Sequence, residues 1–447
     1  MNIIGIAPAR TQEKILAGAL NPVRPLLPTA RLEEWCREAQ HEWRDCVWGP
    51  SLTILACIWK QLQATASARQ TEDWVATLSP DHAADTRDGS DFCAARKRLP
   101  LAVFEHALRH VGCQASSSFH YCFHDLPVWL LDGSTLRTPN TPENEQHFGR
   151  GRNAARSSRS PILRLVVLIC AGSGAVLDMA LGPFLTSELA LFWQLLARLP
   201  AGGLLVVDRG FSSYLVFALV QQHGTHVLAR QHATRRGLLL KRFRRGDELQ
   251  LWVRPMPHWS AFPHLLPSCP QLLVVRVITQ IIHRRGFRDW TLSIATTLTD
   301  HRRYDANDLI EFYLRRWDVE LTLRTLKTHY RIAQLTAHTP DIIRKEVCAT
   351  VLAHNCVAAL MAQSGEAPRF LSPTRARSLL LIYSERMTAA PTVHLPALFR
   401  DLLRLIATAY QLPQERPPQP RAIIQRPSTY PVLMTTRQAW RRAYHAA

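Results

Sequence analysis

Two uninterrupted apolar runs, each followed by an aspartate, constrain the fold of this chain more than any other feature. Residues 128–131 lead into Asp132, and residues 203–207 lead into Asp208. Apolar runs of this length without polar alternation are typical of central strands that are covered on both faces of a sheet. Binding crevices of open α/β sheets lie at the ends of such strands. The sequence therefore predicts a mixed α/β fold with two carboxylates at strand ends, facing solvent.

Each aspartate has a simpler interpretation when it is taken alone. An Asp-Gly pair such as Asp132-Gly133 commonly opens a turn, and an Asp before a helical stretch, as at Asp208, commonly caps it. For a single residue of this kind, the turn or cap is the more frequent role. Two strand-end acids together with a third acid on a helix favour a functional site.

The third acid lies in residues 308–327, which lack Pro and Gly and are rich in Leu, Arg and Glu, so the sequence predicts a helix. At roughly 100° per residue, four polar side chains fall within about 60° of one face of this helix. These side chains are Tyr313, Arg316, Glu320 and Lys327. One carboxylate, two cations and a phenol suit a metal ion beside a phosphodiester. The alternative is a solvated face with spaced ion pairs.

The helix resembles the Tyr-x2-Arg-x3-Glu-x6-Lys signature of bacterial insertion-sequence transposases of the IS4 family. The strand-end segments Asp132-Gly-Ser and Asp208-Arg-Gly-Phe resemble the first and second catalytic acids of that family. Asp289-Trp290, at the head of a further predicted strand, also matches the family pattern. The resemblance covers about residues 90 to 360, so both ends of the chain are less well matched.

The resemblance implies an RNase H-like DDE core with a β-rich insertion and cut-and-paste DNA transposition through a hairpin intermediate. It implies that Asp132, Asp208 and Glu320 are the catalytic residues. The same three residues would hold two Mg²⁺ ions, with Mn²⁺ as a substitute, and oxygen ligands suit both ions. DNA phosphates would be contacted by the remaining signature residues, Tyr313, Arg316 and Lys327.

Trp290 has two interpretations. An aromatic residue in a strand most often packs in the core or plugs a sheet edge. The resemblance instead implies that Trp290 stacks where a DNA base near the cleavage site has been displaced.

The charge balance of the 447 residues agrees with a DNA partner. The formal net charge of +19 and the pI near 10.1 indicate a polyanionic partner. The resemblance specifies double-stranded DNA, namely the terminal inverted repeats of the element and the target, bound by a homodimer. No apolar run approaches the roughly 18–20 uncharged residues of a membrane span. Ten scattered cysteines without a Cys-x2-Cys pair suggest cytosolic thiols, so we expect a cytoplasmic, nucleoid-associated bacterial protein without membrane contact.

Two further segments are candidates for DNA contact. Residues 138–160 are polar and rich in Gly and Arg, which predicts an extended or disordered loop. In one interpretation its arginines contact DNA phosphates, and in the other the loop is only solvated. The arginines are Arg150, Arg152, Arg156 and Arg159. Two short predicted helices around Arg96, Lys97 and Arg98 would either bind DNA in a helix-turn-helix manner or form a packed pair with a basic exterior.

The predicted organisation has five parts. An N-terminal helical region, which could bind DNA, covers 1–121, and the first part of the RNase H-like core covers 122–232. A β-rich insertion covers 233–287, the second part of the core with the Glu-bearing helix covers 288–362, and a helical, Pro- and Arg-rich C-terminal region covers 363–447. The insertion could instead be a separate β domain without a catalytic part.

Two other functions remain open at this point. An RNase H-like nuclease or resolvase would cleave DNA without strand transfer. A basic DNA-binding protein would use its carboxylates only for structure.

Overall fold

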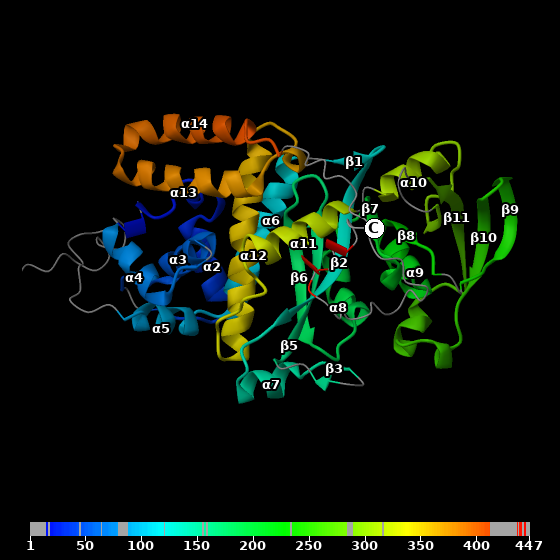
Figure 1. Ribbon diagram of the computed structural model, residues 1–447, viewed down its shortest axis with the longest axis horizontal. Helices are drawn as coiled ribbons and strands as arrows, with labels where there is room; N and C mark the ends of the chain where they lie inside the picture. Colours follow the sequence, from blue (N-terminus) through cyan, green and yellow to red (C-terminus); the bar gives the residue numbers. More distant parts are fainter. Residues whose placement is uncertain are drawn as a thin grey trace, which may run out of the picture. The chain divides into compact units, whose positions relative to one another are not determined.

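The computed structural model describes residues 15–16, 18–43, 46–63, 65–78, 88–119, 121–153, 156–157, 160–232, 235–283, 289–314, 317–411, 436, 438–439 and 442–443. For residues 152–153, 156–157 and 317–321 the backbone alone is described. The chain divides into two units, one formed by residues 1–282 with 290–411 and the other by residues 283–289 with 412–447. All the helices and strands labelled in Figure 1 belong to the first unit.

A mixed sheet of ten strands forms the centre of this unit, in the order β6-β5-β2-β7-β8-β12-β11-β10-β9, with β1 (Cys122–Phe123) beside β2. One half of this sheet comprises β2 (Leu126–Arg137), β5 (Ile162–Cys170), β6 (Val176–Pro183), β7 (Leu204–Val207) and β8 (His226–Arg230). The first three of these strands are antiparallel, and β2, β7 and β8 are parallel. This is the strand order of an RNase H-like core, so the predicted fold class is confirmed.

The β-rich insertion continues the same sheet. It contributes β9 (Leu238–Arg244), β10 (Asp247–Val253) and β11 (Leu272–Ile282), and β12 (Trp290–Thr296) follows in the part predicted as the second half of the core. All four are antiparallel to their neighbours, and β12 joins the core through β8, where Ile294 pairs with Arg230. The strand β9 coincides with a basic stretch of the sequence that includes Lys241, Arg242 and Arg244. The limits of the five predicted parts stay predictions.

A buried ion pair fixes the insertion to the segment that leads into α10 (Ala306–Leu314). The Arg276 guanidinium donates two hydrogen bonds of 2.8 and 2.7 Å to the Asp247 carboxylate, and a third of 2.6 Å to the Tyr304 carbonyl. Both ionic side chains are at most 4% exposed. Because an unpaired charge at this depth would be costly, both partners are required together.

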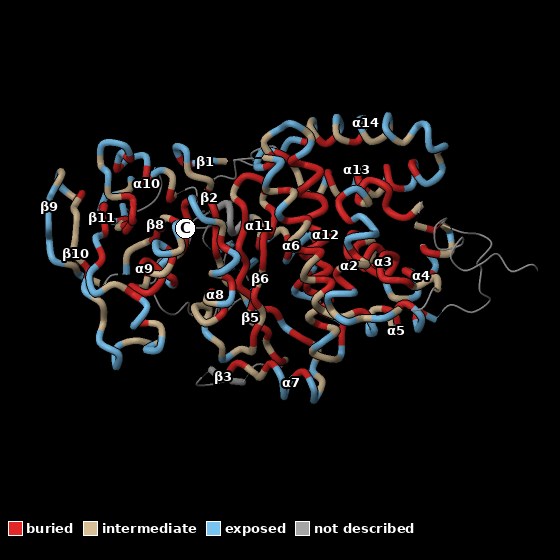
Figure 2. The backbone as a smooth tube through the Cα atoms, turned by 180° about the vertical axis from the view of Figure 1, so that it is seen from behind, coloured by how far each residue is buried: buried red, intermediate tan, exposed pale blue. Residues whose placement is uncertain are grey.

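Helices cover both faces of the core strands. Along β2 the side chains alternate, so that Leu130 packs with one core cluster and Leu131 with the other. The face of Leu131 is covered by α8 (Glu188–Leu195) and α9 (Tyr214–Gln222). The face of Leu130 is covered by α6 (Leu101–Ser118), α11 (Trp317–Thr328) and α12 (Pro340–Gln363). Figure 2 shows the buried residues concentrated in these strands and in α12.

The helix α12 is mostly buried. Among the described residues it is the helix that is long and apolar enough to cross a membrane, but 94% of its apolar window is buried inside the protein. At the N-terminal side, α3 (Pro50–Gln63) packs on α12, and α3 in turn contacts α2 (Thr29–Glu38), α4 (Ala68–Thr77) and α5 (Ser90–Arg98). The C-terminal helices are α13 (Pro373–Ala389) and α14 (Leu395–Ala407), and the predicted tail lies mostly outside the described residues.

Three local predictions need correction or remain open. The strand predicted to end at Asp132 continues to Arg137, because β5 pairs with it from Trp129 to Arg137. The segment 138–160 is not simply a loop: it contains α7 (Pro142–Phe148), capped by the Thr141 hydroxyl, and a short ladder of β3 (Arg152–Asn153) with β4 (Arg156–Ser157). The helix predicted over 308–327 is described as α10 and α11, and residues 315–316 between them lie outside the described residues.

Candidate active site

The parallel pairing of β2 with β7 places two aspartates side by side. The ladder runs from Val128 opposite Leu204 to Leu131 opposite Val207 and ends there. Asp132 and Asp208 are the next residues on the two strands. Neighbouring strands lie about 4.8 Å apart, so the two aspartates are adjacent where β7 ends. Both are half-buried, which leaves part of each side chain accessible.

Backbone amides hold both carboxylates. Asp132 Oδ1 accepts a 2.8 Å hydrogen bond from the Gly133 amide. Asp208 Oδ1 accepts from the Arg209 amide and caps the short helix η4 (Arg209–Phe211). The cap that the simpler interpretation predicted for Asp208 is therefore present. It does not exclude a second role, because a carboxylate has two oxygens and about four acceptor positions.

The helix α11 places the third predicted acid near this pair. It packs on β2, and Leu323 and Leu326 of α11 are buried in the same core cluster as Leu130. Leu130 and Asp132 lie on one face of β2, because side chains two residues apart share a face. Glu320 lies one helical turn before Leu323, and its side chain is outside the described residues. Among the described side chains, no three His, Cys, Asp or Glu residues are arranged to hold a metal ion.

Tyr313 connects α10 to the end of β7. Its side chain is buried, and its hydroxyl donates a 3.3 Å hydrogen bond to the carbonyl of Val207, the residue before Asp208. The sequence predicted a contact with DNA phosphate, whereas the structure places the hydroxyl on the strand that positions an acid. Of the other two signature residues, Lys327 is exposed in the last turn of α11, and Arg316 lies outside the described residues.

Trp290 begins β12 opposite Ile282 and is 38% exposed. The Arg230 guanidinium lies over its ring at 5.5 Å from the centroid. A ring of this exposure is not a core residue, and the cation covers part of it. The remaining surface of the ring is accessible to a DNA base, and stacking of a base on it stays a prediction.

The arginines of segment 138–160 are only partly described. Arg150 is held by the Glu145 carboxylate in two hydrogen bonds of 2.6 and 2.7 Å and by the Asn140 side chain. The hydrogen bond from Arg150 is the main reason that the pKa of Glu145 lies below its ordinary value. Arg150 is therefore engaged within the protein. The side chains of Arg152 and Arg156, and the whole of Arg159, lie outside the described residues.

One carboxylate that packs on β2 from the face opposite to the Asp132 side chain was not predicted from the sequence. Glu188, the first residue of α8, lies against Gly133, so closely that a Cβ atom at position 133 would be 2.4 Å from its Cδ atom. The glycine after Asp132 thus leaves the space that Glu188 occupies. No local pattern predicts this contact, because α8 and β2 are far apart in the sequence.

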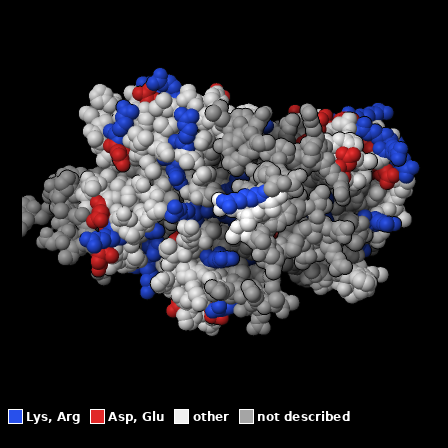
Figure 3. Space-filling model, viewed as in Figure 1, with Lys and Arg blue, Asp and Glu red and all other residues white. Residues whose placement is uncertain are grey.

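Basic side chains are spread over the face of the molecule seen in Figure 3, and several gather at the outer edge over β9. The exposed cations of this strand and the turn after it are Lys241, Arg242, Arg244 and Arg245. The sheet thus carries positive charge at the end remote from the helical layers, in agreement with the polyanionic partner that the net charge predicts.

A family model for the transposase DDE domain matches residues 124–356, more than half of the chain. The chain belongs to the DDE transposase family. It is 26% identical over 329 residues, 70% of each chain, to the transposase InsG for insertion sequence element IS4 of Escherichia coli (strain K12). It is 29% identical over 134 residues to the putative transposase InsZ of the same organism, covering 29% of this chain and 44% of the relative. The predicted membership of the IS4 transposases is confirmed.

Among solved structures, the piggyBac transposase synaptic complex with hairpin DNA is similar over 92% of this chain and 87% of its own, at 10% identity and a TM-score of 0.42. The RNase H-like assignment depends on the strand order of this transposase itself. A DDE domain cleaves and transfers DNA, so this transposase is an enzyme of that class.

The position of Tyr313 gives a testable prediction for this transposase. Tyr313→Phe removes the hydrogen bond to Val207 and should lower the free energy of unfolding by about 0.5–1.5 kcal/mol. Cleavage should fall while DNA affinity stays unchanged, because the end of β7 loosens. Urea unfolding, a gel-shift titration and a nicking assay measure the three quantities. A loss of DNA affinity at unchanged stability would instead assign the hydroxyl to a phosphate.

Proposed function

We propose that this transposase catalyses cut-and-paste transposition of an insertion sequence by metal-dependent phosphoryl transfer. The observation that supports the proposal is the register of β2 and β7, which sets Asp132 beside Asp208 on the sheet face over which α11 packs. A local turn or helix cap uses only the carboxylate of its own segment. Two carboxylates from different strands and one from a helix therefore indicate a shared ligand instead of three separate caps or turns.

The donors in this site fit Mg²⁺ or Mn²⁺. Asp132, Asp208 and Glu320 offer only carboxylate oxygens, which are hard ligands for such ions. They would hold two ions. When bound, the ions activate the attacking hydroxyl and stabilise the leaving oxygen.

The protein itself positions the strands and balances charge, since phosphoryl transfer needs little covalent help from side chains. The hydrogen bond from Tyr313 to Val207 fixes the strand end that carries Asp208. Lys327 and Arg316 would neutralise the phosphate beside Glu320. Further phosphate contacts would come from the arginines of segment 138–160, of which Arg150 would first have to leave Glu145.

The reaction would begin with attack of water on the phosphorus at an element end, which releases a 3′-hydroxyl. That hydroxyl would attack a phosphorus of the opposite strand, which closes a hairpin on the element end and releases the 3′-hydroxyl of the flanking DNA. A second water would attack the hairpin phosphorus and release the 3′-hydroxyl of the element again. This 3′-hydroxyl would then attack a phosphorus of the target DNA and displace a 3′-hydroxyl of the target strand. Terminal inverted repeats and target DNA are the expected substrates, bound by a homodimer, and the expected location is the bacterial cytoplasm beside the nucleoid.

The three acids give the direct test of this function. Asp132→Ala, Asp208→Ala and Glu320→Ala should each reduce Mg²⁺-dependent cleavage by at least about a hundredfold, because charge stabilisation at the phosphate is lost. DNA affinity should stay near the wild-type value, because binding is spread over many cations. Plasmid excision and a gel shift measure both effects.

Glu385→Ala, which removes an exposed carboxylate from α13, is the matched control and should behave as wild type. Normal excision by one of the three variants would remove that residue from the site. Cleavage without any joined target product in the wild type would indicate a nuclease instead of a transposase.

Trp290 gives a prediction for the hairpin step. Trp290→Ala should leave first-strand nicking largely intact and reduce hairpin yield by about tenfold, since stacking of one base on an aromatic ring contributes roughly 1–3 kcal/mol. An abasic site at the displaced position should restore part of the yield. Gel analysis of nicked and hairpin products measures this. A parallel loss of both products in a thermally destabilised variant would show that Trp290 only packs.

A further inference from the structure

The polypeptide between β12 and α10, residues 297–305, is held by the β-rich insertion. Arg276 of β11 donates a 2.6 Å hydrogen bond to the Tyr304 carbonyl. The Asp247 carboxylate of β10 accepts two further hydrogen bonds from the same guanidinium, at 2.8 and 2.7 Å. Because all these groups are buried and the guanidinium has three fixed partners, the Tyr304 backbone is held at a set distance from β11.

An aromatic contact holds the same segment at a second point. The ring of Phe243, in β9, stacks on the ring of His301 with 4.0 Å between the centroids and 10° between the planes. The Arg276 guanidinium lies 5.7 Å from the centroid of the same Phe243 ring. The strands β9, β10 and β11 therefore all contribute to the position of the backbone that leads into α10.

The other end of α10 contacts the strand that carries the second acid. The Tyr313 hydroxyl donates to the carbonyl of Val207, which directly precedes Asp208. Between the two ends, Leu309 is fully buried in the core cluster on this face of the sheet. A packed helix moves as a rigid element, so a shift of Tyr304 before its first turn is carried to its last turn.

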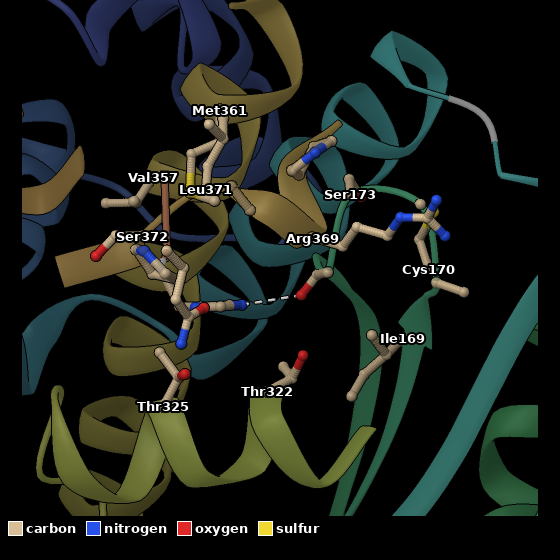
Figure 4. A pocket seen from close by; sticks show the side chains of 18 of the residues that line it. Ile169, Cys170, Ser173, Thr322, Thr325, Val357, Met361, Arg369, Leu371 and Ser372 are labelled. Atoms are coloured by element: carbon tan, nitrogen blue, oxygen red, sulfur yellow. Dashed lines mark hydrogen bonds between the residues drawn. The ribbon is translucent and has the colours of Figure 1, made fainter. Parts of the chain in front are cut away.

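The core holds α10 from another side. Phe312 of α10 stacks with Tyr121, the residue before β1, at 6.1 Å between the ring centroids. The Arg369 guanidinium lies over the Tyr121 ring at 5.0 Å from its centroid. Arg369 also lines the cavity around His354, between α11 and α12 (Figure 4). The helix α10 is thus in contact with the insertion, with the end of β7 and with the layer that contains α11.

Arg276 is too far from the aspartates to take part in the chemistry directly. It pairs with Thr296 of β12, Thr296 pairs with Leu228 of β8, and Leu228 pairs with Val206 of β7. Three spacings of about 4.8 Å separate Arg276 from β7 by about 14 Å. Its guanidinium is also engaged in three hydrogen bonds. Any influence of Arg276 on the reaction therefore passes through the elements that it contacts.

We propose that Arg276 is a positioning residue for the phosphoryl transfer. It sets the start of α10 through the Tyr304 carbonyl, and α10 sets the end of β7 through the Tyr313 hydroxyl. The β-rich insertion thereby contributes to catalysis by fixing the geometry at Asp208. The inference rests on the proposed function, because that function makes Asp208 a metal ligand. A displacement of about 1 Å at such a ligand is enough to lower the rate by about a hundredfold.

The test replaces the ion pair by apolar side chains in the full-length transposase. Arg276→Met combined with Asp247→Leu removes both charges together, which is often neutral for stability, and leaves the backbone ladder from β11 to β7 in place. Arg254→Met is the matched control, because this guanidinium donates to two backbone carbonyls inside the insertion, both at 3.0 Å. His301→Ala removes the aromatic contact alone and decides the question if the double variant does not fold.

Three measurements are made on each protein. Thermal melting and a gel shift establish folding and DNA affinity. ¹⁹F NMR of 3-fluorotyrosine in place of Tyr313 reports the surroundings of this ring, and its signal should shift in the double variant, shift less in His301→Ala and stay unchanged in Arg254→Met. Mg²⁺-dependent nicking should fall about tenfold or more in the double variant, and less in His301→Ala, at unchanged DNA affinity.

A combination with Tyr313→Phe tests whether the two residues act on one path. In that background the double replacement of Arg276 and Asp247 should lower nicking little further, because the link to Val207 is already broken. Independent effects of the two changes would multiply and would contradict the proposed path.

The remaining outcomes each contradict the inference or the function beneath it. Nicking at the wild-type rate in a folded double variant would make the ion pair a purely structural contact. Loss of nicking without a shift of the signal at Tyr313 would show that the effect does not pass through α10. An equal loss in Arg254→Met would assign it to the stability of the insertion. Absence of Mg²⁺-dependent nicking in the wild type would defeat the proposed function, and the NMR comparison would still test the link to α10.

Discussion

Four parallel residue pairs between β2 and β7 determine where the chemistry of this transposase can occur. They fix Asp132 next to Asp208, and a slip of the register by one residue would turn Asp132 to the opposite face of the sheet. Gly203 helps to set the register. A Cβ atom there would come within 2.4 Å of Trp129 Nε1 and 2.6 Å of the Pro127 carbonyl, so β7 can approach β2 only with glycine at its start.

The helix α12 supports the same sheet from its other end. Asn355 accepts a hydrogen bond from the Val176 amide at 2.8 Å and donates to the carbonyls of Val176 and Leu108, which joins α12 to both β6 and α6. Nearer its start, Glu346 accepts hydrogen bonds from the Thr336 and Ala337 amides in the segment after α11. Buried polar groups that are fully paired in this way rigidify their surroundings, so α11 lies on a fixed support.

Local patterns in the sequence were enough to predict most of the core. The apolar runs at 128–131 and 203–207 predicted β2 and β7, and the composition of residues 308–327 predicted the helical segment described as α10 and α11. The end of β2 was missed because its residues after Asp132 are polar, and its continuation depends on pairing with β5. The helix α7 was missed because its segment is polar, although Thr141 before Pro142 is a regular helix start.

The rest of the site depends on contacts between distant parts of the chain. Glu188 contacts Gly133, Arg276 is paired with Asp247, and the cavity around His354 is lined by segments that are far apart in the sequence. The spacing of residues in the sequence does not predict contacts of this kind. The catalytic roles proposed for Asp132, Asp208 and Glu320 come from the resemblance to IS4 transposases. The spacing of the residues alone did not distinguish these roles from structural ion pairs and helix caps.

We propose that the end of β7, the adjacent part of β2 and α11 together hold metal ions. Cleavage of the polypeptide by Fe²⁺ with ascorbate and peroxide tests it, because radicals formed at a bound ion cut the backbone nearby. Mass spectrometry should find cuts next to Asp132, Asp208 and Glu320, suppressed by excess Mg²⁺ and absent after Asp208→Ala. Cuts at other positions, or the same cuts in the Asp208→Ala protein, would contradict the account.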